Sequence, residues 1–385
     1  MQYDLVFEGG GAKGVVFGGA LQAFESAGHT VHRLIGTSAG AITATLLAAG
    51  YDATSFQRVM NEKLPNGQAR FTSFMDVPQS FDETAVENSL SYQILADIDF
   101  PYVPESIEKH VDRLVIAALM QVPVYRNIFS FIERGGWFAG TAFMDWLREK
   151  LDADGRNLAH ATLAQFHQKQ PDNELTVIAA DTAGNERLIL NHRTAPDCPV
   201  VWAVRMSMSI PFVWQEVTWK TEWGLYRGRD ITGHTIVDGG LLSNFAIDLL
   251  VSKDPDIQEI MNIANGDVNP LGFLIDENLP VPDADPPPSG EPSAIESALS
   301  KVDIQQLKTV RRITRLVDTL TGASTSYIIH SHRHRVCRLP ANGYGTTEFG
   351  MSEQRLNALI AIGRKTLGDF LVNLIDDPDE NEDDT

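Results

Sequence analysis

A serine flanked by glycines, in the stretch Gly36-Thr37-Ser38-Ala39-Gly40, is the first group in this sequence with clear chemical potential. The GxSxG spacing is typical of a nucleophile elbow, in which a sharp turn between strand and helix exposes a hydroxyl. The flanking glycines lack side chains that would clash in such a turn. The pattern therefore predicts Ser38 as the nucleophile of an acyl-transfer reaction.

A serine hydroxyl is a poor nucleophile until a base takes its proton. The segment Ile236-Val237-Asp238-Gly239-Gly240 offers a carboxylate directly after a short apolar run. Its two glycines leave room for the carboxylate to approach another loop. A DGG triplet taken alone is usually a simple turn. The presence of the serine motif in the same chain is what favours a catalytic role for this one. We expect Asp238 to be the general base.

The opening segment VFEGGGAKGVVFGG fits two glycine signatures. Gly9, Gly11 and Gly14 satisfy the dinucleotide fingerprint, and the same backbone amides are suited to hold an oxyanion. A dinucleotide fold needs an acidic residue at the end of the second strand, where this chain has the serine motif instead. A P-loop needs Lys and then Ser or Thr after its last glycine, where Val15 and Val16 stand. An oxyanion hole is therefore the favoured interpretation.

Taken together, the motifs GGGAKG, GTSAG and DGG resemble those of patatin-like phospholipases, in the same order. The resemblance runs from about Asp4 to Leu250 and includes VIAADTAGNERLIL and AVRMSMSIPFVW. It extends more weakly to RVCRLPANGYGTTEF. It implies an α/β fold, a three-layer sandwich with a mostly parallel central sheet and a serine nucleophile elbow. One departure is Ala246, where the family often has proline two residues after the asparagine equivalent to Asn244.

The resemblance also implies a role for each residue of the three motifs. Ser38 would be the nucleophile and Asp238 its base, without a catalytic histidine. The oxyanion hole would be formed by Gly9, Gly10, Gly11, Ala12, Lys13 and Gly14, and the supporting glycines would be Gly36, Gly40, Gly239 and Gly240. Lys13 opposes the macrodipole of the helix expected after it, so helix stability does not explain it. It either balances an oxyanion or lipid phosphate, or pairs with a carboxylate such as Glu8.

By the same resemblance, the expected activity is that of a phospholipase A, which cleaves acyl esters of membrane phospholipids through an acyl-enzyme. No cofactor and no metal are expected. Two alternatives stay open. One is a Ser-Asp-His α/β-hydrolase or acyltransferase, because His330, His332 and His334 follow in the required chain order. The other is a non-catalytic lipid-binding regulatory module. The need for an activator or regulatory protein also stays open.

Two strand, turn and helix units in succession are expected to position these motifs. The first comprises Asp4–Phe7, Gly9–Gly14 and Val15–Ala27, and the second Val31–Ile35, Gly36–Gly40 and Ala41–Ala49. Such repeated units imply a parallel sheet. Two further strands are predicted at Leu175–Ala180 and Arg187–Asn191, joined by a turn.

The predicted organisation is a catalytic domain at 1–275, followed by a flexible loop or linker at 276–295. Within the domain, regular periodicity fails at 64–137, which is either a lid or insertion or an ordinary helical layer. Residues 296–375 are expected to form a helix, a strand and a helix packed on the catalytic domain, and Ile304–Leu320 is the first of these. The acidic tail at 376–385 is expected to be disordered.

Composition sets the remaining limits. With 385 residues and 43% hydrophobic content the chain can bury a full core. Its net charge of -20 argues against nucleic acid as a partner. The two cysteines suit a reducing compartment, and the N-terminus lacks a secretory signal pattern. We expect a cytoplasmic protein that is peripheral at the membrane when active, and delivery as a secreted effector without a signal peptide stays open.

Overall fold

The computed structural model describes residues 1–79, 81, 83–90, 93, 118–263, 268–282, 284–285, 333–346 and 348–376. Several predictions lie outside these residues: the linker beyond residue 285, the helix Ile304–Leu320, His330, His332 and the acidic tail after residue 376.

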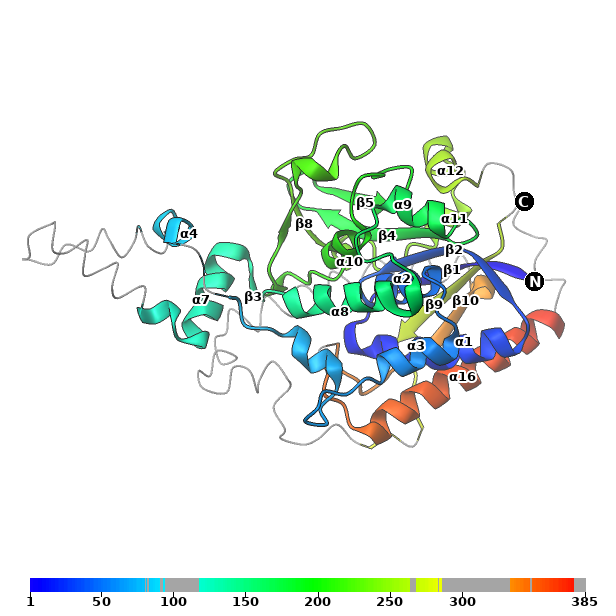
Figure 1. Cartoon of the computed structure of the whole chain (residues 1–385). Helices are drawn as coiled ribbons and strands as arrows, with labels where there is room; N and C mark the ends of the chain where they lie inside the picture. Colours follow the sequence, from blue (N-terminus) through cyan, green and yellow to red (C-terminus); the bar gives the residue numbers. More distant parts are fainter. Residues whose placement is uncertain are drawn as a thin grey trace, which may run out of the picture.

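A central eight-stranded sheet forms the middle of the molecule (Figure 1). Its strands are β1 (Gln2–Phe7), β2 (Thr30–Thr37), β4 (Glu174–Asp181), β5 (Glu186–Leu190), β7 (Val217–Thr218), β8 (Thr235–Asp238), β9 (Pro270–Asp276) and β10 (Val336–Pro340). The order is β10-β9-β1-β2-β4-β8-β7, and β5 pairs with β4. Pairing is parallel from β10 to β4, whereas the pairs β4–β5, β4–β8 and β7–β8 are antiparallel. The prediction of a mostly parallel sheet is confirmed.

Helices cover both faces of this sheet. One face packs on α1 (Val16–Ser26), α2 (Ala39–Ala48), α3 (Ala53–Met60), α8 (Thr141–Asp152), α10 (Val200–Ser207) and α16 (Glu353–Asp376). The other face packs on α11 (Asp248–Val251) and α12 (Pro255–Met261). Alternation along β1 explains the two cores, because Leu5 and Phe7 face the first core and Val6 faces the second. The arrangement is the predicted three-layer sandwich.

The remaining short elements connect these layers. They are η1 (Gly11–Val15), η2 (Arg70–Phe74), α4 (Glu83–Glu87), α7 (Pro123–Arg134), β3 (Gly136–Phe138), η3 (Ala153–Gly155), α9 (Leu163–Lys169), β6 (Phe212–Trp214), η4 (Thr221–Trp223), η5 (Gly239–Leu241) and η7 (Arg333–Arg335). The helix predicted at Val15–Ala27 is preceded by the 3-10 turn η1, which occupies the second half of the predicted glycine loop.

The described part of the 64–137 segment contributes both to the core and to a separate projection. Phe74 of η2 packs against Phe143 and Trp146 in the main core. Helices α4 and α7 lie away from the sheet, on the left of Figure 1. Strand β3 follows α7 and pairs in parallel with β6, forming a second, two-stranded sheet.

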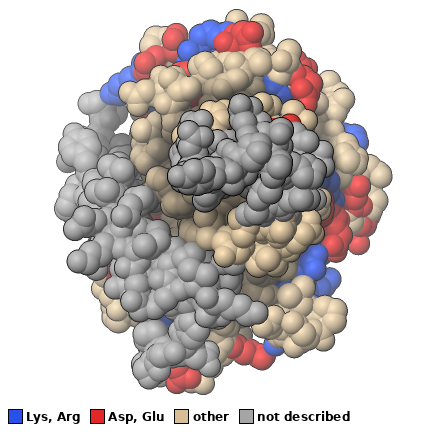
Figure 2. Space-filling view, turned by 90° about the vertical axis from the view of Figure 1, so that its left-hand side faces the viewer, with Lys and Arg blue, Asp and Glu red and all other residues tan. Residues whose placement is uncertain are grey.

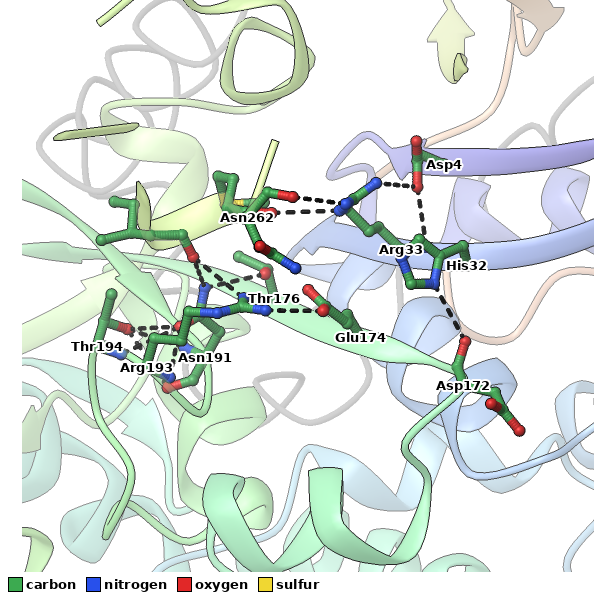
Figure 3. Close-up of polar contacts among 12 residues, drawn as sticks. Asp4, His32, Arg33, Asp172, Glu174, Thr176, Asn191, Arg193, Thr194 and Asn262 are labelled. Atoms are coloured by element: carbon green, nitrogen blue, oxygen red, sulfur yellow. Dashed lines mark hydrogen bonds and ion pairs between the residues drawn. The ribbon is translucent and has the colours of Figure 1, made fainter. Parts of the chain in front are cut away.

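Buried ion pairs and hydrogen bonds tie together the end of the sheet at which β1, β2 and β4 begin (Figure 3). Arg33 Nη1 lies 3.1 Å from Asp4 Oδ1, and Arg193 Nη2 lies 2.7 Å from Glu174 Oε1. Asn191 Nδ2 donates to the carbonyl of Ile260 at 3.1 Å. These contacts fix the amino ends of the parallel strands. The glycine loop and the serine turn follow the opposite, carboxyl ends of β1 and β2, and the DGG motif follows the antiparallel strand β8.

Candidate active site

Ser38 stands at the junction of β2 and α2, in the turn that its flanking glycines predict. Its backbone has a φ of 53° and a ψ of -118°, and the residue is 6% exposed. A side chain at Gly36 would run into the carbonyl of Gly40, and one at Gly40 would run into the carbonyl of Phe7. A positive φ in a non-glycine residue costs about 1–3 kcal/mol and is characteristic of functional sites. The elbow is therefore a strained turn that only this glycine spacing accommodates.

Sheet register brings Ser38 and Asp238 to the same level on either side of β4. Thr37 of β2 is paired with Ile178, and Asp238 of β8 is paired with the next residue, Ala179. Neighbouring strands lie about 4.8 Å apart, so the backbones of the two residues are about 10 Å apart across β4. Their side chains can meet over that strand.

Asp238 is 5% exposed, and burial raises the pKa of its carboxyl from the ordinary 3.8 to about 7. The Ser38 side chain and the Gly240 amide, both hydrogen-bonding neighbours, lower the pKa by smaller amounts. Oδ1 accepts the Gly240 N–H at 2.7 Å. Oδ2 is buried, and no group of the described residues lies within the usual distance and angle of a hydrogen bond to it. One carboxylate oxygen is thus anchored to its own loop, and the other is free to take a proton.

A serine-rich segment at the end of α10 supports both residues. Ser207 Oγ accepts the backbone N–H of Ser38 at 2.9 Å and donates to the carbonyl of Ile178 at 2.6 Å. The carbonyl of Ser209 accepts the N–H of Asp238 at 2.9 Å. Sequence reasoning noted the segment AVRMSMSIPFVW but assigned these serines no role. Ser207 acts through its hydroxyl and Ser209 through its backbone carbonyl, and no local pattern in the sequence indicates either contact.

Arg205, also on α10, holds this segment in place. It is 2% exposed, and burial lowers the pKa of its guanidinium to about 10. The guanidinium donates to the carbonyls of Ala139 and Gln215 at 2.9 and 3.0 Å, and also to Ser209 Oγ. A single buried side chain therefore connects β3, β6 and the segment that holds Asp238.

The glycine loop lies beside the elbow. The Gly9 N–H donates to the carbonyl of Asn244 at 3.1 Å, and the Ala12 N–H donates to the carbonyl of Thr346 at 2.9 Å. No described residue accepts a hydrogen bond from the amides of Gly10 or Gly11. Gly11 has a φ of 54°, a conformation that glycine adopts readily. Of the predicted oxyanion donors, these two amides are the ones available to a ligand.

Asn244 and Glu8 link the glycine loop to the loop of Asp238. Asn244 Nδ2 donates to Glu8 Oε1 at 3.2 Å and to the carbonyl of Gly9 at 3.1 Å. Glu8 Oε2 accepts the Ile275 N–H at 2.7 Å. Burial is the main cause that raises the pKa of Glu8 to about 8. Next to Asn244, the carbonyl of Ser243 accepts the hydroxyl of Thr37 at 3.1 Å, so this segment touches all three motifs.

Lys13 is buried, with 4% exposure, and its ammonium forms an ion pair with Glu277. Of the interpretations left open by the sequence, pairing with a carboxylate is present here. The ion-pair partner is Glu277, while Glu8 is near enough for Lys13 to lower its pKa. The Glu8 carboxyl is turned toward Asn244 and the amide of Ile275 instead. Glu277 follows β9 in the chain, a position with no sequence signal that connects it to Lys13.

The loop between β10 and α16 lies over the glycine loop and is held by Arg355. Arg355 Nε lies 2.7 Å from Glu348 Oε1, and its Nη2 donates to the carbonyl of Gly343 at 2.7 Å. Nη1 donates to the carbonyl of Asp285 at 2.6 Å. Through Thr346, which accepts the Ala12 amide, this loop forms part of the site.

An apolar cavity opens beside Ser38 and passes between the glycine loop, η2 and the loop before α16. Glu348 is the acidic side chain on its wall, and the glycine loop contributes Gly11 and Ala12. The apolar lining consists of Val15, Ile42, Met60, Phe71, Phe74, Phe143, Met208, Ile210, Trp214, Phe349, Met351 and Leu356. A lining of this composition suits a hydrocarbon chain next to a nucleophile.

Of the three histidines considered for a triad, His334 is the one that the structure describes. It lies in η7, two residues before Val336. Val336 pairs with Gly272 of β9, Gly272 pairs with Val6 of β1, and Val6 pairs with Ile35 of β2, so Val336 and Ile35 lie at the same level of the sheet. At about 3.3 Å per residue and 4.8 Å per strand, His334 and Ser38 are roughly 20 Å apart. That separation rules out a hydrogen bond from His334 to Ser38.

The described residues contain no cluster of three or more His, Cys, Asp or Glu side chains that could bind a metal ion. None of the helices in the described parts of the chain combines the length and the apolar character needed to cross a bilayer.

Comparison with known proteins gave matches of three kinds. The model of the patatin-like phospholipase family matches residues 5–251. The chain is 28% identical over 260 residues to the uncharacterized protein YqhO of Bacillus subtilis strain 168, covering 66% of this chain and 68% of YqhO. VipD from Legionella pneumophila aligns over 96% of this chain and 67% of VipD, with 17% identity and a TM-score of 0.43.

The type III effector ExoU of Pseudomonas aeruginosa aligns over 97% of this chain and 53% of ExoU, with 18% identity and a TM-score of 0.38. The chain therefore spans about half the length of ExoU. The match to the family model begins before the glycine loop and ends beyond the DGG motif. Because this match covers more than half of the sequence, the chain belongs to the patatin-like phospholipase family.

Proposed function

We propose that this protein is a lipid acyl hydrolase of the phospholipase A type, which cleaves acyl esters through a Ser38–Asp238 dyad. The observation that carries the proposal is the placement of Ser38 and a buried Asp238 at one level across β4, with an apolar cavity beside the serine. Family membership supports lipid hydrolysis as the reaction class.

Asp238 takes the proton of Ser38 while the hydroxyl oxygen attacks the ester carbonyl. A pKa of about 7 suits this role, since a base is most effective when its pKa lies near the working pH. The unpartnered Oδ2 is the oxygen that receives the proton. Protonated Asp238 then returns the proton to the departing alcohol, leaving the acyl group on Ser38.

The free amides of Gly10 and Gly11 stabilise the tetrahedral oxyanion. One such donor is typically worth about 3–4 kcal/mol of barrier lowering. Water then attacks the acyl-enzyme, with Asp238 as its base, and releases a fatty acid. The apolar cavity holds the acyl chain during both steps.

Two variants test the dyad. Purified Ser38→Ala and Asp238→Asn proteins should each lose hydrolysis of phospholipid vesicles and of a short soluble ester by about a thousandfold or more. Ser26→Ala, an exposed serine on α1, is the matched control and should keep the wild-type rate. Wild-type turnover in either dyad variant would refute the mechanism. Lipid mass spectrometry of the products then identifies the headgroup and the acyl position.

The two alternatives predict different results. Replacing His330, His332 and His334 with alanine should leave the rate unchanged for a dyad and abolish it for a triad. A fluorophosphonate probe should label wild-type protein and fail to label Ser38→Ala. A catalytically silent lipid-binding module would show no labelling of either protein.

A further inference from the structure

We propose that the end of the molecule formed by α4, α7 and the β3–β6 ribbon is a docking surface for a zwitterionic phospholipid bilayer. The proposal rests on the proposed function, because it names the form in which the substrate meets the site. It does not depend on which ester bond is cleaved.

Exposed large apolar side chains are concentrated at this end. Of the ten with high exposure among the described residues, six lie in α7 or β6, directly before α7, or in the segments that follow η2 and α4. The six are Val77 (38% exposed), Leu90 (60%), Val122 (42%), Tyr125 (42%), Ile132 (58%) and Phe212 (37%). Soluble surfaces carry such residues singly, whereas a gathering of them marks an interaction site.

Helix α7 presents part of this group as a ridge. Tyr125 and Ile132 are seven residues apart, so they lie on one face of the helix, two turns from each other. The opposite side of α7 is buried: Asn127 is 3% exposed, and the hydroxyl of Ser130 donates to the carbonyl of Gly136 at 2.5 Å. These polar contacts and the apolar packing of Ile128, Phe129 and Phe131 fix the helix to the body, while Tyr125 and Ile132 stay exposed.

Phe212 joins this surface to the cavity. Its φ of 68° is a strained conformation for an aromatic residue, and its ring lies 6.0 Å from that of Phe131 on α7. The residues two before and two after it, Ile210 and Trp214, line the cavity beside Ser38. One short segment thus has its outer side chain on the apolar surface and its inner side chains in the wall of the cavity.

The charge distribution decides which kind of bilayer fits. Figure 2 views this end, where Lys, Arg, Asp and Glu atoms lie mainly around the rim and uncharged residues occupy the visible centre. The whole chain carries a net charge of -20, so an anionic membrane would repel it. Apolar side chains surrounded by a polar rim suit the interface of an electrically neutral bilayer.

The test measures vesicle binding separately from catalysis. Full-length protein with Ser38→Ala is floated with phosphatidylcholine vesicles, and the double variant Tyr125→Ser/Ile132→Ser is made in that background. Since each fully inserted apolar side chain is worth about tenfold in affinity, loss of the two should weaken binding by about tenfold to a hundredfold. Leu225→Ser/Val372→Ser removes two side chains that are equally exposed but lie on other elements, and it should bind as the parent does.

The same two substitutions are then made in protein that retains Ser38. Hydrolysis of vesicles should fall in proportion to binding, whereas hydrolysis of a soluble ester should stay within twofold of wild type. Unchanged vesicle binding, or an equal loss in the Leu225/Val372 control, would overturn the proposal. So would conversion of a dimer to a monomer without a change in binding, which would make this surface a contact between copies. Binding by a protein that hydrolyses no ester would overturn the proposed function and leave the docking surface standing.

Discussion

Asp238 combines a buried position with a single anchored oxygen, and this combination sets the pH behaviour of the site. A raised pKa means that the carboxyl keeps its proton at mildly acidic pH. A protonated Asp238 cannot accept the proton of Ser38. As the pH falls below about 7, the proposed dyad should therefore lose activity progressively.

The pH profile of kcat/KM is accordingly expected to rise through a midpoint near pH 7 and then level off. Hydrolysis of a soluble ester between pH 5 and 9 measures it. Glu8 has a pKa of about 8 and is the other buried acid at the site, so Glu8→Gln serves as the control. The midpoint should stay in place in that variant. A midpoint near pH 4 in the wild-type enzyme would show that Asp238 ionises as an ordinary carboxyl.

Among individual residues, those of the three motifs could be predicted from the sequence. The residues that hold the motifs in place could not. Ser38 and Asp238 stand in short patterns whose glycines are needed locally. Asn244 and Glu277 act through contacts with residues more than 200 positions away, namely Gly9 and Lys13. Such pairings depend on which strands become neighbours, and no local pattern encodes that choice.

The loop between β10 and α16 supports the site, because its Thr346 carbonyl accepts the Ala12 amide of the glycine loop. Arg355 is 2% exposed. Among the described residues, Glu348 is the one charged group within hydrogen-bond distance of its guanidinium. Removal of one member of a buried ion pair leaves the other charge uncompensated.

Arg355→Met should therefore lower the free energy of unfolding by about 3 kcal/mol, as measured by urea denaturation. Arg364→Met, at an exposed position on the same helix, is the control and should change stability by less than about 0.5 kcal/mol. Equal midpoints for the two variants would contradict the role assigned to Arg355.

Among the elements, the strands of the two predicted βα units match the structure closely, since β1 and β2 extend the predicted ranges by only a few residues. The direction of β8 was not predicted. Nothing in Thr235–Asp238 distinguishes a parallel from an antiparallel partner, although the antiparallel pairing with β4 is what sets Asp238 level with Ser38.

The whole molecule carries a strong negative charge, which acts at a distance on any surface it approaches. The screening length falls from about 30 Å at 10 mM salt to about 8 Å at 150 mM. Repulsion from an anionic bilayer should therefore be strong at low salt and weak at physiological salt.

Binding to vesicles that contain phosphatidylglycerol is accordingly expected to increase several-fold between 10 and 150 mM NaCl. Binding to pure phosphatidylcholine should change little over the same range. Co-sedimentation measures both. A decrease with salt on the anionic vesicles would instead indicate attraction through a local basic patch, contrary to the charge distribution described above.

The placement of the dyad across β4 also determines when the protein can first act on a lipid. Ser38 leaves the ribosome early, and its base follows about 200 residues later, after both β4 and α10 have been made. At about 5–20 residues per second, that interval lasts roughly 10–40 seconds. Under the proposed mechanism, a growing chain has Ser38 without its base during this time, so an unfinished copy should not hydrolyse the lipids of the cell that makes it.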